Sequence, residues 1–424
     1  MGEVQAIVTV MKLCSPTCLA VLLFATSVAP GFQVNHRSTV AVKDFEFQPP
    51  IGLSRVLWRR RIPLDNPMTP DRVALGQALY FDKRLSIDGT VSCATCHDPA
   101  NAFTDHDTVG RGASNRAGTR NAPTILNAMF SEQLFWDGRV ASLEEQAKQP
   151  MTSPFEMGMV SNDAVVARVR AIPEYRKMFQ RVFGRERITI DTIVKAIAAY
   201  ERTLLSANSP FDRFISGDAK AITPAQKRGW ELFKGKAKCI ECHSYTASSP
   251  FFTDFKFHNT GIVAEEMNFE HLSLLAKQMA DHERIKSSDK TSNLRRNLPS
   301  SVGQIQDSVP LLAHTKGFTE LGRYLVTKQP KDIAAFKTPT LRDIELTTPY
   351  MHNGSEKTLI EVVRFYNQGG NPNANLDKRL RALNLSDDEI NNLVEFMRAL
   401  TSDEILRRTQ SSKPQTRAAV TVRP

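Results

Sequence analysis

The sequence predicts a mainly α-helical chain of two similar domains in tandem, with long loops between the helices. A Cys-x-x-Cys-His segment occurs twice, at Cys93–His97 and at Cys239–His243. A short helix with a Thr-Pro start precedes each segment, and a helix with regularly spaced apolar residues follows far downstream of each. At 424 residues the chain is long enough for two compact domains and their connections.

The first domain is expected at residues 31–215. Thr69 is placed as the N-cap, and Pro70 at the first position, of a helix that leads to the first Cys-x-x-Cys-His segment. Apolar residues at helical spacing predict a closing helix within Thr189–Leu205.

The second domain, at residues 216–405, repeats this order. Thr223 and Pro224 begin a helix that ends shortly before the second Cys-x-x-Cys-His segment. A capping box at Ser386 opens the closing helix. Residues 264–316 are charged and polar with little periodicity, so we expect a surface insertion that is partly disordered. The basic tail at 406–424 has the same character.

Residues 1–30 have the features of a secretory signal peptide. The apolar run Leu19–Ala25 is short for a membrane span, and small residues follow it as a cleavage site requires. Pro30 leaves an uncleaved anchor as the alternative. Cleavage would remove Cys14 and Cys18 and leave only the four cysteines of the two repeated segments. The prediction is a periplasmic protein.

The formal net charge is +10, yet the sequence has no basic run interleaved with aromatic residues. Binding to nucleic acid is therefore not expected. A basic surface suits acidic partners or the cell envelope.

Each Cys-x-x-Cys-His segment predicts a covalently attached c-type haem. Two thiols can bond the two vinyl groups, and the adjacent imidazole can reach the iron. A zinc site would need a further cysteine or histidine pair, and a redox dithiol would need a βαβ context. The predicted thioether residues are Cys93, Cys96, Cys239 and Cys242, and the predicted iron ligands are His97 and His243. Spacing leaves open whether either iron keeps an open coordination position, as a catalytic haem does.

Several longer segments resemble the bacterial dihaem cytochrome c peroxidase/MauG superfamily, and within it the tyrosine-ligated MauG-like subgroup. The resemblance covers nearly all of the chain after the signal peptide, apart from the insertion and the tail. The segments that carry it are Ala74–Asp82, Thr119–Thr124, Phe135–Arg139, Glu144–Ala147, Phe155–Gly158, Phe252–Phe255, Phe336–Arg342 and Thr348–Gly354.

The resemblance implies that the N-terminal haem reacts with peroxide in a pocket containing Gln146, Pro150 and Glu156. A carboxylate there can relay a proton between the peroxide oxygens, and a glutamine can position the peroxide. Without the resemblance, Glu156 reads as an exposed carboxylate. Arg111 aligns where many members carry a distal histidine, and the nearest histidine, His106, is out of register. We therefore expect an open iron at this haem.

At the C-terminal haem the family register places Tyr366 as the second axial ligand, a position that is often methionine. A core aromatic role for Tyr366, or ligation by Met351 instead, are the alternatives. Trp136 matches a tryptophan that carries electrons or holes between the haems, although it also reads as a packed core residue. A second such tryptophan of MauG is replaced here by Ala237, which counts against the specialised MauG reaction.

The resemblance also implies a calcium ion between the domains. Its ligands would be the Asn121 side chain and the carbonyls of Thr347 and Pro349, which are oxygen donors of the kind calcium prefers.

The leading hypothesis is a peroxidase that reduces hydrogen peroxide at the open N-terminal haem, with electrons delivered through the C-terminal haem. A small cytochrome c or a cupredoxin would be the donor. The alternative is a MauG-like oxidase that uses peroxide-derived high-valent haem iron to modify a partner protein. A non-catalytic dihaem electron carrier is the third hypothesis, and Gln146 and Glu156 argue against it. A homodimer remains open.

Overall fold

The computed structural model describes residues 47–263, 267–286 and 308–411. The expected signal peptide with Cys14 and Cys18, and the tail beyond residue 411, lie outside the described residues. All of the described residues belong to one compact unit, Lys43–Pro424.

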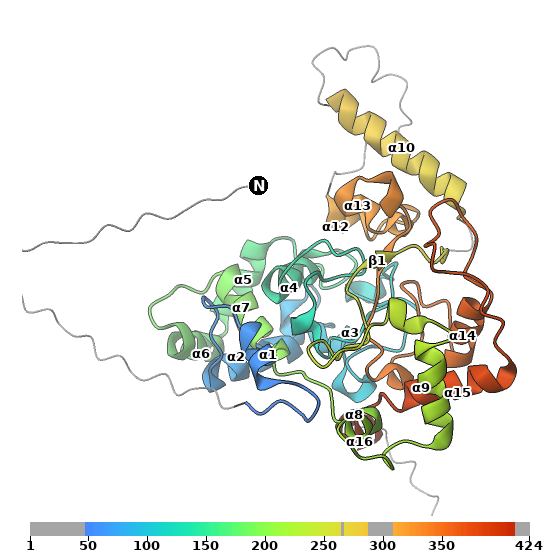
Figure 1. Cartoon of the computed structure of the whole chain (residues 1–424). Coiled ribbons are helices and arrows are strands. Elements are labelled where there is room, and N and C mark those ends of the chain that lie inside the picture. The colour runs from blue at the N-terminus through green and yellow to red at the C-terminus, as the bar shows by residue number, and fades with distance from the viewer. Residues whose placement is uncertain (1–46, 264–266, 287–307, 412–424) are drawn as a thin grey trace, which may run out of the picture. The chain divides into compact units, whose positions relative to one another are not determined.

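Helices dominate this unit, which confirms the predicted mainly α-helical fold (Figure 1). The first half contains α1 (Arg55–Arg60), α2 (Pro70–Phe81), α3 (Cys93–Cys96), α4 (Leu143–Thr152), α5 (Asn162–Ala171), α6 (Pro173–Phe183), α7 (Ile190–Glu201) and α8 (Pro210–Ile215). The second half contains α9 (Pro224–Lys234), α10 (Phe269–Lys286), α12 (Val309–Leu312), α13 (Tyr324–Thr327), α14 (Leu359–Asn367), α15 (Asp387–Arg398) and α16 (Asp403–Ser411). Two short strands, β1 (Phe257–His258) and β2 (Phe336–Lys337), pair antiparallel.

The four predicted helices are confirmed, three of them predicted from their start signals and α7 from the spacing of its apolar residues. The side chains of the N-cap residues accept hydrogen bonds from backbone N–H groups of the first turn in α2, α7, α9 and α15. The N-cap residues are Thr69, Thr189, Thr223 and Ser386. Each cap satisfies a donor that the helix itself cannot satisfy.

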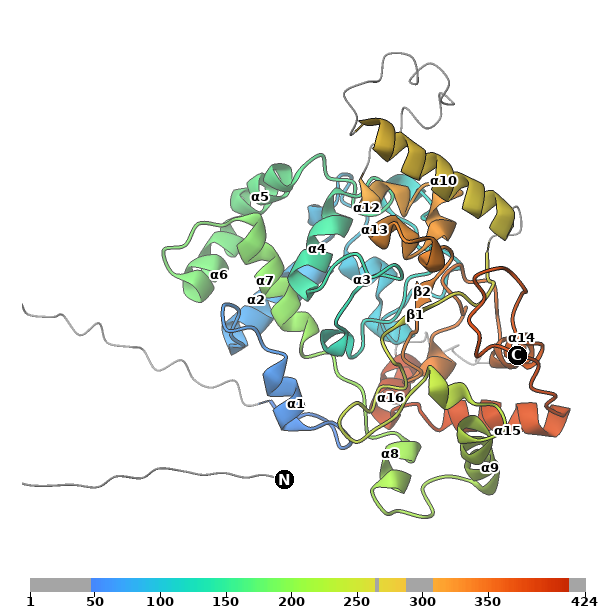
Figure 2. The ribbon, with the colours of Figure 1, turned by 45° about the horizontal axis from the view of Figure 1, so that its top comes forward.

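The same helix crossing occurs twice in the chain. Helix α2 packs against α7, and α9 packs against α15, in separate parts of the unit (Figures 1 and 2). A Cβ atom on Gly76 would lie 1.9 Å from the carbonyl oxygen of Ala196 in α7. A Cβ atom on Gly229 would lie 1.9 Å from the carbonyl oxygen of Asn392 in α15. A glycine is therefore required at both crossings, because any side chain would force the helices apart.

Each helix pair anchors its own hydrophobic core. One core is built around α2, α4 and α7 and includes Leu75 and Ile197. The other is built around α9, α14 and α15 and includes Trp230 and Phe396. The boundary predicted between residues 215 and 216 stays a prediction, because all of these residues lie in one unit.

The segment expected to be a surface insertion contains a helix, Phe269–Lys286, which was not predicted from the sequence. Helix α10 begins after Asn268, whose side-chain oxygen accepts a hydrogen bond from the His271 N–H at 2.8 Å. Buried Leu272, together with neighbouring apolar residues of α10, packs on a small core that includes Leu321 and Tyr324.

The tail expected from residue 406 also begins as a helix. Helix α16 extends to Ser411, and its Ile405 is buried among residues of the first half. The Arg408 guanidinium lies 5.8 Å from the centre of the Phe103 ring. The C-terminal helix therefore packs close to the first Cys-x-x-Cys-His segment.

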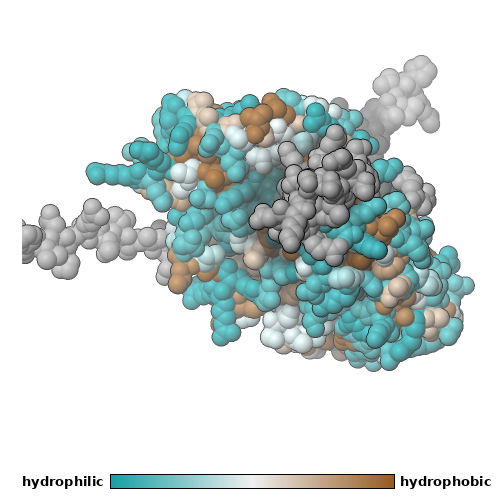
Figure 3. Space-filling view, turned by 90° about the horizontal axis from the view of Figure 1, so that it is seen from above, coloured by the Kyte–Doolittle hydropathy of each residue, from teal (hydrophilic) through white to brown (hydrophobic). Residues whose placement is uncertain are grey.

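Within the described residues, none of the helices combines the length and the hydrophobicity needed to cross a membrane. Figure 3 shows one face on which hydrophobic residues are scattered among hydrophilic ones, outside the part covered in grey. Scattered apolar residues are ordinary on a protein surface, so this face offers no candidate apolar docking surface.

Candidate functional site

Both Cys-x-x-Cys-His segments border one continuous cavity of about 410 Å³. The wall contains His97 and Cys96 from the first segment, and Cys239, Cys242 and His243 from the second.

Each of the two histidines is held in the same way. The Nδ1 atom of His97 lies 3.3 Å from the carbonyl oxygen of Phe103, and that of His243 lies 2.9 Å from the carbonyl oxygen of Phe252. A carbonyl oxygen only accepts, so each Nδ1 carries the hydrogen and Nε2 keeps its lone pair. Burial lowers the pKa of both imidazoles, which keeps them neutral. A neutral imidazole with Nδ1–H bonded to a carbonyl is the usual form of a metal-ligating histidine.

The two residues whose carbonyls bond to these histidines also have the same backbone conformation. Phe103 and Phe252 both have left-handed backbone conformations, with φ of 60° and 53°. The next residue in each case, Thr104 or Thr253, donates its hydroxyl to a carbonyl across the pocket at 2.8 and 2.7 Å. The repeat therefore extends from the helix crossing to individual hydrogen bonds.

The four cysteines are partly buried. Burial raises the pKa of Cys93, Cys96 and Cys239 to about 12, and that of Cys242 to about 11. Such high pKa values disfavour a reactive dithiol, which requires a thiolate. The donor set and the two anchored imidazoles fit a haem at each segment.

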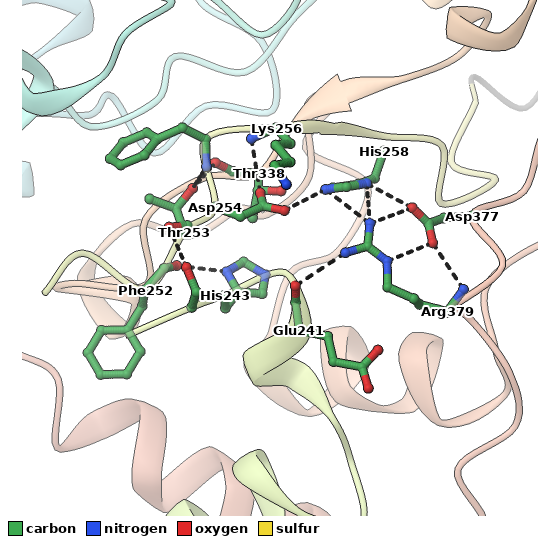
Figure 4. A network of polar contacts seen from close by, with 12 residues as sticks. Glu241, His243, Phe252, Thr253, Asp254, Lys256, His258, Thr338, Asp377 and Arg379 are labelled. Carbon is green, nitrogen blue, oxygen red and sulfur yellow. Dashed lines mark hydrogen bonds and ion pairs between the residues drawn. The ribbon is translucent and has the colours of Figure 1, made fainter. Parts of the chain in front are cut away.

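Cys242 lies beside a network of charged groups (Figure 4). The His258 ring lies between Asp377, at 2.8 Å from Nδ1, and Asp254, at 3.0 Å from Nε2. Arg379 bonds to Asp377 at 2.7 Å. Burial opposes the charge on Asp254, but the hydrogen bond from His258 lowers its pKa to about 2. Arg379 also lies 2.7 Å from Nδ1 of His258, so this imidazole is surrounded by two carboxylates and a guanidinium.

The predicted peroxide pocket is partly assembled around the first segment. Gln146, on α4, and Glu156, just after it, both line the cavity. Burial lowers the pKa of the His97 imidazole, and the negative charge of Glu156 is close enough to oppose this effect. Pro150 lies one turn after Gln146 in α4 and is not part of the wall; its carbonyl accepts the Met157 N–H at 3.0 Å. Pro150 therefore connects the helix to the Glu156 segment.

The loop that carries Arg111 lies against the Glu156 segment. Arg111 lines the cavity. A Cβ on Gly112 would lie 2.2 Å from the carbonyl oxygen of Phe155, and the Ala113 N–H donates to the Glu156 carbonyl at 2.7 Å. This close approach fixes the backbone on both sides of the Glu156 carboxylate.

Sequence reasoning missed one residue in this pocket, His314. It lies at the end of the expected insertion, yet it lines the same cavity. Its Nε2 atom is 3.7 Å from Oε2 of Glu156, and its ring stacks on Phe155 with centroids 5.6 Å apart and planes at 15°. No sequence pattern around His314 indicates a distance so short to a residue 158 positions earlier.

Around the second segment, Tyr366 on α14 lines the cavity. Burial, and then the nearby thiols of Cys242 and Cys239, raise the pKa of its hydroxyl well above the usual value. Met351, the competing ligand, lines the same cavity, so both candidates remain. Ala237 is buried and also borders the cavity.

Trp136 connects the two halves of the cavity wall. Its indole N–H donates to the Asn121 carbonyl at 2.9 Å, and its own carbonyl accepts the Lys337 N–H at 2.9 Å. Asn121 precedes the Pro123 that contacts His97, and Lys337 precedes the Pro339 that contacts His243.

The three predicted calcium ligands, Asn121, Thr347 and Pro349, all border the cavity. The Asn121 amide nitrogen donates to the carbonyl of Asp107 at 2.9 Å, which leaves its amide oxygen as the atom able to bind a cation.

Comparison with known proteins gives a consistent answer. The family model "Di-haem cytochrome c peroxidase" matches residues 70–220. The cytochrome-c peroxidase IdrP1 of Denitromonas iodatirespirans is 38% identical over 374 residues, which is 87% of this chain and 90% of the relative. The methylamine utilization protein MauG of Methylorubrum extorquens is 37% identical over 342 residues, or 80% of this chain and 81% of that protein. The crystal structure of a MauG-like protein associated with microbial copper homeostasis covers 86% of this chain and 96% of its own, at 29% identity and a TM-score of 0.64.

Proposed function

We propose a function from the family to which this chain belongs: it is a member of the dihaem cytochrome c peroxidase family, which also includes MauG. The proposal is that the chain reduces hydrogen peroxide at the haem of Cys93–His97. Electrons would enter through the haem of Cys239–His243 from a small cytochrome c or a cupredoxin. Both haems would be bound through thioether bonds to their cysteines.

One observation carries this proposal: different side chains accompany the two anchored histidines. Glu156 borders the cavity near His97, Gln146 borders the same cavity, and Tyr366 borders it near Cys239 and Cys242. A carboxylate and an amide can handle a proton and a peroxide, and a phenol oxygen can close an iron. The pair therefore supports a reactive first haem and a closed second haem, a division of labour that a simple electron carrier does not need.

His97, Cys93 and Cys96 would hold the haem, which would supply the redox chemistry for peroxide reduction. The Glu156 carboxylate would accept the proton of the oxygen nearer the iron and return it to the outer oxygen, which leaves as water. Gln146 would hold the peroxide by hydrogen bonding through its amide. Two electrons and two protons in total convert one hydrogen peroxide to two waters, and the reduced donor supplies the electrons.

Trp136 would carry electrons between the two haems. Its hydrogen bonds to the backbone of Asn121 and Lys337 place it between the segments that lead to the two histidines. An ion bound by Asn121, Thr347 and Pro349 would stabilise the same wall of the cavity. Export to the periplasm completes the proposal, since c-type haem is normally attached outside the cytoplasm.

The test is spectroscopic and kinetic. Absorption and EPR spectra of the oxidised holoprotein should contain one high-spin and one low-spin haem. Peroxide should then oxidise a reduced small cytochrome c, and Glu156→Gln should slow that reaction by about 10²-fold or more. Two low-spin haems in the oxidised protein, or unchanged turnover in Glu156→Gln, would contradict the proposal.

A second candidate is a MauG-like oxidase that modifies a partner protein, and Tyr366 is the residue that favours it. The 37% identity to a MauG protein agrees with this candidate, and Ala237 counts against it. The Tyr366→Met variant separates the two. An ordinary peroxidase would keep its turnover with a raised potential at the second haem, whereas a MauG-like oxidase would lose its reaction. Tyr245→Phe, at a half-buried aromatic of the same half, is the control for packing effects.

A further inference from the structure

We propose that His314 is a positioning and proton-accepting partner of Glu156 in the pocket of the first haem. The imidazole holds the carboxylate in place and takes up the proton that Glu156 removes from a bound ligand. This inference rests on the proposed function, because it deepens the role of Glu156.

His314 is held firmly beside the pocket by the residues around it. Its N–H donates to the Leu311 carbonyl at 3.0 Å. The preceding carbonyl, of Ala313, accepts the Thr119 hydroxyl at 3.0 Å. Thr119 and Arg120 also bond to Thr319 at 3.1 and 3.0 Å, so the turn is fixed on both sides of His314. The imidazole is thus placed by a network rather than by a free loop.

Each of the two side chains in the contact between His314 and Glu156 has one buried polar atom without a hydrogen-bond partner. Oε2 of Glu156 and Nδ1 of His314 are both buried and make no hydrogen bond. Buried polar atoms are nearly always paired, so two unpaired ones in one pocket point to a functional role. The 3.7 Å between Nε2 and Oε2 exceeds a hydrogen bond, but a small side-chain rotation closes it, as is common at acid–base sites without a bound ligand.

The charges around His314 favour a neutral ring. Burial is the main cause that lowers its pKa; Glu156 opposes this effect, and Arg139 and Arg120 add to it. Asp137 also faces this region, but it is paired with both arginines, at 2.7 Å from Arg120 and 2.9 Å from Arg139. A neutral imidazole is a proton acceptor at neutral pH.

The proton transfer balances without any further reactant. A ligand H–X gives its proton to Oε2 of Glu156 and keeps the electron pair of that bond. Oε2 then passes the proton to Nε2 of His314, in the tautomer that carries hydrogen on Nδ1. The result is an imidazolium and a regenerated carboxylate, and the reverse sequence returns the proton.

The rate of cyanide binding to the oxidised holoprotein tests this proposal without relying on turnover. Hydrogen cyanide must lose its proton to bind ferric haem as an anion, so its association rate reports a distal base. His314→Phe keeps the ring stacked on Phe155 and removes both nitrogens. His314→Gln keeps a hydrogen-bonding group that does not titrate. His271→Gln, at an exposed histidine of α10, is the matched control.

We expect His314→Phe to slow cyanide association at pH 7 by about tenfold or more, with circular dichroism unchanged and with His271→Gln at the wild-type rate. In the wild type the rate should fall only once the pH drops well below the usual pKa of an imidazole, because burial lowers the pKa of His314 and so delays its protonation. His314→Gln should recover part of the rate but lack this pH step.

The outcomes separate the two proposals. If Glu156→Gln slows cyanide binding and both His314 variants bind it like the wild type, this inference is wrong and the proposed function stands. If Glu156→Gln has no effect either, the role of Glu156 itself fails. If the oxidised wild type has two low-spin haems and His314→Phe makes one high-spin, then His314 is an iron ligand rather than a partner of Glu156.

Discussion

Replacing Asp212 by alanine should be among the most destabilising single changes outside the haem pockets. Asp212, on α8, accepts two hydrogen bonds at 2.8 Å from the guanidinium of Arg342, which lies after β2. The side chains of Asp212 and Arg342 are 1% and 2% exposed. Asp212 also accepts the N–H and the hydroxyl of Ser209. The pair thus joins the end of the first half of the chain to the second half.

The expected magnitude follows from the burial of the pair. Removing one partner leaves the other charge buried without compensation, which costs about 3–5 kcal/mol. At about 2.1 cal/mol/K of unfolding entropy per residue over about 340 described residues, this corresponds to a fall in Tm of about 4–7 °C. An exposed ion pair contributes only about 0–1 kcal/mol.

The assay is thermal unfolding of the holoprotein followed by far-ultraviolet circular dichroism. The matched control is Asp403→Ala. Asp403, on α16, forms a half-exposed ion pair at 2.9 Å with Arg213, which lies on α8 next to Asp212. Losing this pair should shift Tm by about 1 °C at most. The double variant Asp212→Ala/Arg342→Met should recover most of the loss, since no charge then stays buried. Equal shifts in Asp212→Ala and Asp403→Ala would refute the reasoning.

Two further predictions concern the helix crossing and the charges near the pocket. Gly229→Ala should destabilise the protein by about 1–3 kcal/mol, because its Cβ would meet Asn392; since alanine favours helices elsewhere, a raised Tm would contradict this contact. For Asp137, burial alone would raise the pKa of the carboxyl, but Arg120 and Arg139 hold it below its usual value. Its stabilising effect is therefore present at neutral pH and lost as the pH falls through this lowered pKa. The Tm of the wild type should drop more between pH 7 and pH 3 than that of Asp137→Asn, and parallel Tm curves would argue against the assignment.

The parts of the fold that could be predicted are those whose cause is local. Four helices begin at an N-cap whose side chain accepts a hydrogen bond from the backbone N–H three residues ahead: Thr69, Thr189, Thr223 and Ser386. A cap of this kind can be recognised from a short stretch of sequence. The two Cys-x-x-Cys-His segments are equally local. Both place an imidazole and thiols against one cavity wall, as their spacing requires.

The parts that escaped prediction depend on packing between distant segments. The sequence of helix α10 does contain a helix start, because Asn268 is followed by apolar residues that include Leu272. The many charged residues around it led to the prediction of an insertion instead. His314 has no local signal. It reaches Glu156 only because Thr119, near the first segment, holds the carbonyl of Ala313. A contact that depends on a hydrogen bond across 194 positions cannot be inferred from spacing.

The hydrogen bonds that recur in both halves lie on the side of each imidazole that faces away from the iron-binding nitrogen. They orient Nε2 and leave the opposite side of the cavity free to differ. That freedom is used by residues outside the repeat: Glu156 and His314 near the first histidine, and Tyr366 near the second. A duplicated scaffold alone would give two equivalent haems, so under the proposed function the difference in chemistry is assigned to these few side chains. Changes at them should therefore alter reactivity with little loss of stability, whereas changes at Gly76 or Gly229 should do the reverse.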